Sequence, residues 1–295
     1  MTQTQITRTN TARTSVISVC FNSSAVLERL LDTIPPTASI VLVDNGSNDG
    51  AATEALAEAH SAQLICNPGN AGFGTACNQG AELSSSEFLF FVNPDSTLNP
   101  STIALLESAA DAHPDASCFN PRIVNRHGQA CFKRRSCLLQ PHEVMPRRVP
   151  LQACEVPVLS GAALFVRRQA FQQIGGFDPN IFLYHEDDDL SLRLRQHVGP
   201  AWFIPAAEVM HLSGHSSGRS AKVAALKAWH MGRSLVYTTT KHQIHAAYRK
   251  AVWSALRQMV SPATLISKRK FYKNRAFLQG VLSARHDQGA GARPC

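Results

Sequence analysis

Acidic residues are almost absent from the last quarter of this sequence. From Arg219 to the end, Asp287 is the only acid against 15 Lys and Arg, whereas residues 1–218 hold 20 acids against 14 Lys and Arg. The net charge of +8 therefore belongs to the C-terminal quarter. Such a basic segment favours an anionic partner, either a membrane surface or a nucleic acid.

Long apolar runs are also missing. The runs at residues 88–92 and 162–166 fall far short of the ~20 residues that a membrane-spanning helix needs. Residues 1–14 lack the apolar core of a signal peptide and are rich in Thr, Gln and Asn, so we expect a disordered N-terminal tail. Both absences predict a cytoplasmic protein.

Metal-binding and nucleic-acid-binding signatures are not found either. The eight cysteines form no CxxC pair and no His/Cys zinc spacing, so they are predicted to be buried free thiols. No helix-turn-helix, zinc-finger or RNA-binding signature accompanies the basic segment, and charge alone gives only non-specific nucleic-acid affinity. At 295 residues, 44% of them hydrophobic, the chain can bury a sizeable core.

Strand and helix patterns alternate through the first half of the chain. Buried apolar runs that end in turn-forming residues predict strands, and the segments between them carry apolar residues at helical spacing. This rhythm predicts an α/β fold with a doubly wound, mostly parallel sheet and helices on both faces. The predicted strands are residues 15–21, 39–43, 63–66, 88–92, 117–124, 156–166, 201–205 and 208–212. A basic helical appendage is predicted at residues 221–237, 244–260 and 267–282.

Carboxylates follow two of the predicted strands. Asp44 ends the second strand, and Asp95 comes after residues 88–92 through Asn93-Pro94. Proline cannot donate to a sheet ladder, so Asp95 is expected just outside the carboxyl end of a central strand, where open α/β sheets bind their ligands. A carboxylate there can hold a divalent cation, and the cation can hold a diphosphate. The alternative is that Asp95 only forms a turn.

A glycine-bearing loop at residues 67–80 runs into the next helix. Backbone N–H groups before a helix can bind an anion. Gly72-x-Gly74 is only part of a dinucleotide fingerprint, because Cys77 occupies the position of the third glycine. Two interpretations stay open: the glycines contact a ligand, or they only permit a tight turn.

Four consecutive acids at residues 186–189 form a second centre of chemistry. A helix that begins there offsets part of their repulsion, and Asp189 can pair with Arg193 one turn later. Helix capping needs one or two acids, which leaves Glu186 and Asp187 for acid–base work. The basic segment at residues 126–151 is predicted to be an irregular flap over the site.

The order of these motifs resembles the family 2 glycosyltransferases, and within them the bacterial rhamnosyltransferase-type members that build O-antigen, capsule or cell-wall polysaccharides. The motifs are Phe21-Asn22, residues 44–50, residues 70–74 with 78–80, Asn93-Pro94-Asp95, residues 175–178, residues 184–187 with Asp189 and Arg193, and His211.

The resemblance implies a GT-A fold and a division of the chain. The catalytic domain would be residues 15–218, with a nucleotide-sugar-binding half at 15–125 and an acceptor-binding half at 126–218. Residues 219–295 would form the basic helical region.

The resemblance also implies roles for single residues. The donor would be bound by Phe21, Asn22, Asp44, Asn45, Asn70, Gly72, Asn78, Asn93 and Asp95. The acceptor would be bound by Gly161, Tyr184 and Trp202. Asp95 and His211 would ligate Mg²⁺ or Mn²⁺, although a lone histidine on a strand is usually structural. Asn93 stands where family members often carry an acid, which would weaken metal binding.

The implied reaction is sugar transfer by single displacement with inversion. Asp187 would be the general base, with its basicity raised by repulsion from Glu186, and the metal would neutralise the leaving diphosphate. The resemblance favours dTDP-rhamnose as donor, with a UDP-hexose as the alternative, and a saccharide or polyprenyl-linked saccharide as acceptor. The basic helices either lie on an anionic membrane or pack on the catalytic domain with a solvated face.

Overall fold

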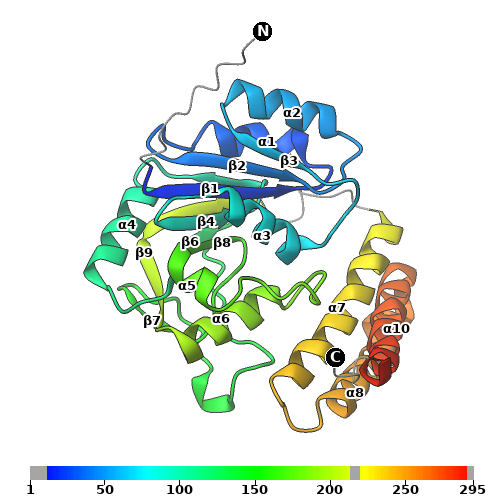
Figure 1. The fold of residues 1–295 in the computed structure, drawn as a ribbon. Helices are drawn as coiled ribbons and strands as arrows, with labels where there is room; N and C mark the ends of the chain where they lie inside the picture. The colour runs from blue at the N-terminus through cyan, green and yellow to red at the C-terminus, as the bar shows by residue number, and fades with distance from the viewer. Residues whose placement is uncertain (1–11, 213–219, 291–295) are drawn as a thin grey trace.

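Residues 12–212 and 220–290 are described by the computed structural model, as an α/β body and a helical appendage beside it (Figure 1). The expected disordered tail lies outside the described residues up to residue 11, and the first strand already begins at Thr14. Residues 213–219 also lie outside the described part of the chain.

The described residues contain one nine-stranded sheet. Its strands are β1 (Thr14–Cys20), β2 (Ser39–Asp44), β3 (Gln63–Cys66), β4 (Phe88–Val92), β5 (Ser96–Leu98), β6 (Cys118–Val124), β7 (Cys154–Val156), β8 (Ala163–Arg167) and β9 (Ala201–His211). The order is β3-β2-β1-β4-β8-β6-β9-β5, with β7 beside β9. The first four strands pair in parallel, as predicted, and β8 then pairs antiparallel with β4.

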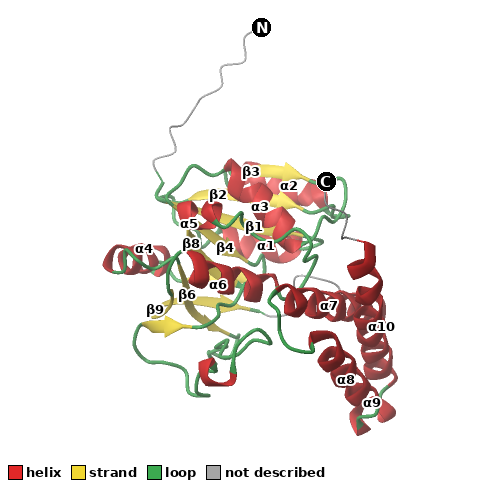
Figure 2. Cartoon of the chain, turned by 60° about the horizontal axis from the view of Figure 1, so that its bottom comes forward, coloured by secondary structure: helices red, strands yellow, loops and turns green. Residues whose placement is uncertain are grey.

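Helices cover both faces of the sheet (Figures 1 and 2). The helices of the body are α1 (Ser24–Leu31), α2 (Gly50–Ala59), α3 (Phe73–Leu83), α4 (Thr102–Ala112), α5 (Arg168–Gln173) and α6 (Glu186–His197). Apolar side chains of α1, α2 and α4 pack in one core cluster, and those of α3, α5 and α6 pack in another. Strand β4 serves both, because Phe90 joins the first cluster and Phe91 the second. The α/β prediction is therefore confirmed.

Three strand predictions differ from the structure. The segment predicted as one strand at 156–166 is two strands, β7 and β8, joined by a loop that contains Gly161. The two strands predicted around Pro205 are one strand, β9, because a shift in its register with β6 absorbs the proline. Strand β5 was not predicted, since three residues carry too little pattern.

The cysteine prediction holds only in part. Cys20, Cys77 and Cys118 are buried in the body, as expected. Cys66, Cys131 and Cys137 are exposed, because they lie at a strand end or in the irregular segment rather than on apolar faces.

The appendage has its own core. It consists of α7 (Ala221–Lys241), α8 (Ala247–Met259), α9 (Pro262–Ile266) and α10 (Lys268–Ala290). Helices α7 and α10 approach closely, since a Cβ at Gly232 would meet the backbone of Phe277 and one at Gly280 would meet Trp229. Among the described residues, no helix combines the length and the apolar character that crossing a bilayer requires.

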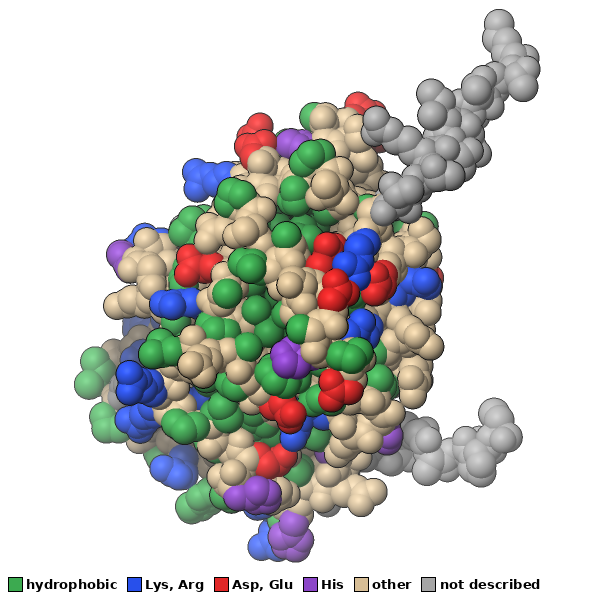
Figure 3. Space-filling view, turned by 90° about the vertical axis from the view of Figure 1, so that its left-hand side faces the viewer, with side chains coloured by type: hydrophobic (Ala, Val, Ile, Leu, Met, Phe, Trp, Pro, Cys, Tyr) green, Lys and Arg blue, Asp and Glu red, His purple; other side chains and the backbone are tan. Residues whose placement is uncertain are grey.

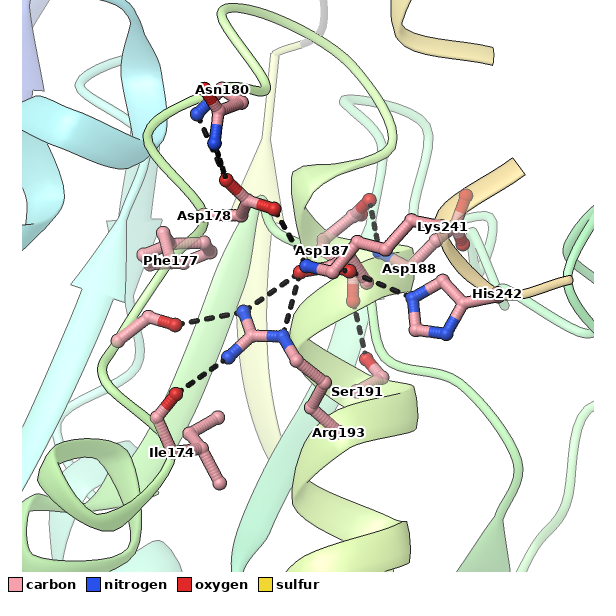
Figure 4. A network of polar contacts seen from close by, with 12 residues as sticks. Ile174, Phe177, Asp178, Asn180, Asp187, Asp188, Ser191, Arg193, Lys241 and His242 are labelled. Atoms are coloured by element: carbon pink, nitrogen blue, oxygen red, sulfur yellow. Dashed lines mark hydrogen bonds and ion pairs between the residues drawn. The ribbon is translucent and has the colours of Figure 1, made fainter. Parts of the chain in front are cut away.

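Ion pairs join the end of α7 to the start of α6 (Figure 4). The fully buried carboxylate of Asp189 accepts from Arg193 Nε at 2.8 Å, from Lys241 Nζ at 2.7 Å and contacts His242 Nε2 at 2.7 Å. Lys241 also meets Asp178 Oδ2 at 2.6 Å. The predicted Asp189–Arg193 pair is confirmed, and it is part of a network that fixes the appendage to the body.

Candidate active site

A cavity of about 390 Å³ opens between the carboxyl ends of β1 and β4, the start of α6, and α7. Its wall includes Phe21, Asn22, Asn70, Asn93, Gly161, Tyr184, Glu186 and Asp187, which are eight of the residues predicted for the site. Residues far apart in the sequence therefore meet around one space, as expected for strand ends in an open sheet.

The Asp187 carboxylate is held in place from two sides. Its Oδ2 accepts from the Gly161 N–H at 2.9 Å, and its Oδ1 accepts from the Asp188 N–H at 2.9 Å. A Cβ at Gly161 would lie 3.1 Å from the Asp187 Cβ, so a larger residue there would have to displace Asp187 slightly. This geometry leaves a fixed proton acceptor on the cavity wall, and it gives Gly161 a role in orienting Asp187.

Lys133 was missed by the sequence analysis. Its Nζ lies 2.7 Å from Asp187 Oδ2 and 2.8 Å from Asp188 Oδ1. Burial opposes the charge on Lys133, but the two carboxylates outweigh burial and raise the pKa of the ammonium above its usual value. The segment predicted to be a flap therefore places the Lys133 ammonium group against the acidic cluster. No pattern in the segment distinguishes Lys133 from the other basic residues around it.

Glu186 lies next to Asp187 and has a raised pKa. Its burial, followed by the charge of Asp187, raises the pKa of Glu186 to about 8. Its Oε2 has no hydrogen-bond partner among the described residues, although the side chain lines the cavity. A buried carboxyl with a free oxygen there can accept or donate a proton near neutral pH.

Asp95 and His211 lie together next to Asn93. The His211 Nε2 is 3.1 Å from Asp95 Oδ1 and 3.3 Å from Asn93 Nδ2. Ser96, which directly follows Asp95, pairs with His211 between β5 and β9, so the sheet itself brings the two predicted ligands together. A carboxylate oxygen and an imidazole nitrogen at this spacing fit a divalent cation such as Mn²⁺.

Asp44 keeps one carboxylate oxygen buried and without a hydrogen bond among the described residues, while Oδ2 accepts from the Ser47 N–H at 3.2 Å. Ser47 also accepts from the Asn22 N–H at 2.9 Å, which ties this loop to the cavity wall. An unsatisfied buried acceptor is costly, so a ligand that donates a hydrogen bond would be favoured there.

Asn45, Asn70 and Gly72 form a local support. Asn45 Nδ2 donates to Asn70 Oδ1 at 3.1 Å, and the Gly72 N–H donates to the same oxygen at 3.0 Å. Gly72 has φ +93°, and a Cβ there would lie 2.8 Å from the Phe182 carbonyl oxygen. These contacts favour the interpretation in which the glycine permits a tight turn, since its N–H is already used.

Seven predicted residues are not among those that line the cavity: Asp44, Asn45, Gly72, Asn78, Asp95, Trp202 and His211. Two of them, Asn78 and Trp202, make packing contacts elsewhere in the body. The Asn78 side chain makes two hydrogen bonds with the backbone of Phe177. Its Nδ2 donates to the carbonyl oxygen and its Oδ1 accepts from the N–H, both at 2.9 Å. Trp202 stacks on His113 with ring centroids 3.6 Å apart. Both contacts stabilise the body, so neither residue enters the proposal below.

Helix α7 supplies one wall of the cavity. Val223, Leu226, Lys227 and His230 line it, and His230 stacks on Phe182 at 4.2 Å between centroids. The sequence predicted this helix, but nothing in its pattern indicated that it would fold back over the strand ends. The appendage therefore completes the site.

A cluster of Cys137, His185 and Asp188 lies behind Asp187. Three potential ligand atoms of this cluster lie within 4.8 Å of one another. Burial would lower the pKa of His185, but its hydrogen bond with Asp188, followed by the contact with Cys137, raises the pKa to about 10. Both carboxylate oxygens of Asp188 already have a basic partner, Lys133 Nζ at 2.8 Å and His185 Nδ1 at 3.0 Å, so the arrangement is that of an ion-pair network.

Sequence comparison decides the family. Residues 15–175 match the family described as Glycosyl transferase family 2. The chain belongs to this family. It is 31% identical over 260 residues to N-acetylglucosaminyl-diphospho-decaprenol L-rhamnosyltransferase of Mycobacterium tuberculosis, a match that covers 77% of this chain and 84% of the relative. It is 25% identical over 185 residues to dTDP-rhamnosyl transferase RfbF of Shigella flexneri, covering 60% of this chain and 61% of the relative.

Solved structures support the same fold. GalNAc-T7 with UDP, GalNAc and Mn²⁺ superposes with a TM-score of 0.62 at 18% identity, over 95% of this chain and 58% of that one. Mannosyltransferase PcManGT from Pyrobaculum calidifontis, in complex with GDP-Man and Mn²⁺, gives 0.58 at 15% identity, over 94% and 88%. This glycosyltransferase therefore has the GT-A fold.

Proposed function

We propose that this family 2 glycosyltransferase moves rhamnose from dTDP-rhamnose to a hydroxyl of a lipid-linked saccharide, with inversion at the anomeric carbon. One observation carries the chemistry: a fixed carboxylate, Asp187, opens on the same cavity as the strand ends that carry Asn22 and Asn93. The relatives in Mycobacterium tuberculosis and Shigella flexneri are both named as rhamnosyltransferases.

Asp187 is the general base of the proposed reaction. A sugar hydroxyl is a poor nucleophile until a base removes its proton, and a positioned base contributes roughly 10²- to 10⁴-fold to the rate. Gly161 and Lys133 hold Asp187 in one orientation. None of the described cysteines lines the cavity, which favours single displacement.

The donor lies against the ends of β1, β2 and β4 in this proposal. The unsatisfied oxygen of Asp44 accepts from the pyrimidine base, and Asn22 lies beside it. Asp95 and His211 hold Mg²⁺ or Mn²⁺. When bound, the cation supplies positive charge to the diphosphate leaving group. Asn93 adds no charge, so binding of the cation relies on the donor phosphates as well.

The acceptor lies on the side of α6 and α7. Tyr184 and Gly161 line that part of the cavity, together with the apolar side chains of Val223 and Leu226. A lipid-linked saccharide suits this mixture of polar and apolar groups. The enzyme then works in cell-surface polysaccharide synthesis, at the inner face of the cell membrane.

A thermal-shift screen followed by a transfer assay tests the proposal. The purified chain is heated with dTDP-rhamnose, UDP-hexoses, GDP-mannose or a single-stranded oligonucleotide, each with and without Mn²⁺. We expect the largest rise in melting temperature with dTDP-rhamnose and Mn²⁺, because a ligand that binds only the native state stabilises it. A larger shift with a UDP-hexose would overturn the donor, and a shift with the oligonucleotide alone would overturn glycosyl transfer.

A further inference from the structure

The end of the appendage carries an unusual surface, here called the basic edge. It consists of the exposed side chains of α8, α9 and the start of α10: Arg249, Lys250, Trp253, Leu256, Arg257, Val260, Ile266, Lys268, Arg269, Lys270, Tyr272 and Lys273. In Figure 2 these elements form the corner of the molecule farthest from β3 and α2.

Large apolar side chains on the basic edge face solvent. Trp253 is 66% exposed, Val260 is 71% exposed and Ile266 is 86% exposed. Trp253 and Leu256 lie three residues apart on one face of α8, and Val260 follows four residues later, directly after the helix ends. Scattered exposed apolar residues are normal, but a helical stripe of them is typical of an interaction surface.

The basic edge is a fixed structure rather than a frayed end. Asn274 of α10 donates to the Gln258 carbonyl oxygen at 3.2 Å and to Thr264 Oγ1 at 2.7 Å. Thr264 in turn donates to the same carbonyl oxygen at 2.7 Å. These bonds hold the end of α8, α9 and the start of α10 together, so the apolar stripe and the cations keep one arrangement.

We propose that the basic edge docks on a lipid bilayer that contains anionic lipids. Cations on the edge meet the headgroups, while Trp253, Val260 and Ile266 enter the boundary between headgroups and acyl chains. Asp287 is the only acid beyond Arg219, so no carboxylate of α8 or α9 opposes an anionic surface. On the face shown in Figure 3, by contrast, acidic and basic side chains occur side by side.

The same features disfavour other occupants. A second copy would bring its own cations against those of the edge, and like charges in contact repel. Single-stranded nucleic acid is bound through a basic groove with aromatic platforms. The edge also exposes the aromatic side chains of Trp253 and Tyr272, but its most exposed large apolar side chains, Val260 and Ile266, are aliphatic and match the interior of a bilayer.

The proposed docking connects to the active site through α7. This helix packs on α10 at Gly232 and Gly280, and its Leu226 lines the cavity and is 58% exposed. The inference deepens the proposed function and rests on it for the lipid-linked acceptor. An enzyme docked in this way meets a polyprenyl acceptor at the membrane surface, where the sugar protrudes.

Vesicle co-sedimentation tests the docking without donor or acceptor. The full chain is mixed with vesicles of phosphatidylcholine with or without phosphatidylglycerol. We expect binding only with the anionic lipid, and less of it at high salt, because salt screens exposed charges. The triple variant K268Q/R269Q/K270Q is expected to bind about a hundredfold more weakly, since each basic residue near the surface contributes about fivefold.

Matched variants separate the basic edge from general effects. R126Q/R135Q/R147Q removes three exposed charges from the body, and L151S removes an apolar side chain that is 74% exposed. Both are expected to bind vesicles like the parent chain, whereas W253S loses about tenfold. Vesicle binding that falls equally in the body variants and the edge variants would overturn the proposal.

Two further measurements distinguish the other occupants. Light scattering of the parent chain and W253S shows whether the edge joins two copies, and a dimer that W253S converts to monomer would overturn the proposal. Oligonucleotide binding that the edge variants abolish, while vesicle binding stays intact, would do the same. D187N is expected to bind vesicles normally, so a failed transfer assay leaves the docking result readable.

Discussion

The body and the appendage use charge in opposite ways. In the body, acids and bases meet inside the fold, as Asp187 meets Lys133 and Asp189 meets Arg193. In the appendage, the cations of α8 and the start of α10 point outward beside exposed apolar side chains. Charge in the body therefore orients reacting groups, whereas charge in the appendage is available to an outside surface.

Helix α7 belongs to both regions. Its first half lines the cavity with Val223 and Leu226, and its end places Lys241 and His242 against Asp189. The two regions therefore differ in chemistry but are connected through this one helix. Substitutions can therefore separate turnover, stability and acceptor binding.

The largest effect is expected from D187N. The amide keeps the size of the side chain but cannot take a proton, so we expect transfer to slow by roughly a thousandfold. Donor-induced thermal stabilisation should persist, because Asp187 lies on the acceptor side. D32N, a change at a mostly exposed acid in the body, is the control and should leave the rate unchanged. A D187N enzyme of normal rate would place the base elsewhere.

The next effect is expected at the junction, from D189N. Burial would raise the pKa of Asp189, but the hydrogen bond with His242 and the charges of Arg193 and Lys241 outweigh it and lower the pKa to about 2. The variant leaves buried cations without their anion, which costs about 3 kcal/mol of unfolding free energy at pH 7.

The stabilisation that Asp189 contributes depends on pH. The unfolded carboxyl has a pKa of about 3.9, so the stabilisation by Asp189 is complete above about pH 4 and is lost as the pH falls toward about 2. Urea titrations at pH 6 and pH 3 should therefore show a smaller gap between parent and D189N at the lower pH. E54Q, at an exposed acid of α2, serves as control. A gap that does not change with pH would mean that Asp189 contributes packing alone.

A smaller effect on rate is expected from K133M. Without the ammonium, Asp187 loses one of the contacts that hold it, and its orientation is fixed by backbone N–H groups only. We expect kcat to fall about tenfold to thirtyfold.

Two controls test the role of Lys133. K133R keeps the charge and should keep most of the rate, and R135M removes an exposed charge from the same segment. A normal rate in K133M would mean that the backbone N–H groups hold Asp187 without help from Lys133.

The body was largely predictable from its sequence, and the completed site was not. Apolar runs such as Phe88–Val92 predict buried strands. Strands that pair in parallel bring their ends together, and for this reason Asn22 and Asn93 line one cavity. The position of α7 depends on tertiary contacts, including Lys241 with Asp189, that no local pattern encodes. Lys133 was missed for the same reason, since it lies 54 positions before its partner Asp187.

The smallest effect is expected from L226A, which tests whether the appendage contributes to the acceptor side of the cavity. Leu226 is 58% exposed on the cavity wall, so only part of its apolar surface is available to an acceptor. At about 25 cal/mol per Å², losing that part should raise KM for a polyprenyl-linked acceptor roughly threefold to fivefold. The dissociation constant of dTDP-rhamnose should not change, and L83A, at an apolar side chain of α3 that is 48% exposed, should change neither constant. If L226A weakened donor binding instead, α7 would belong to the donor side of the cavity. The appendage would then contribute to donor binding, which we assign to the body alone.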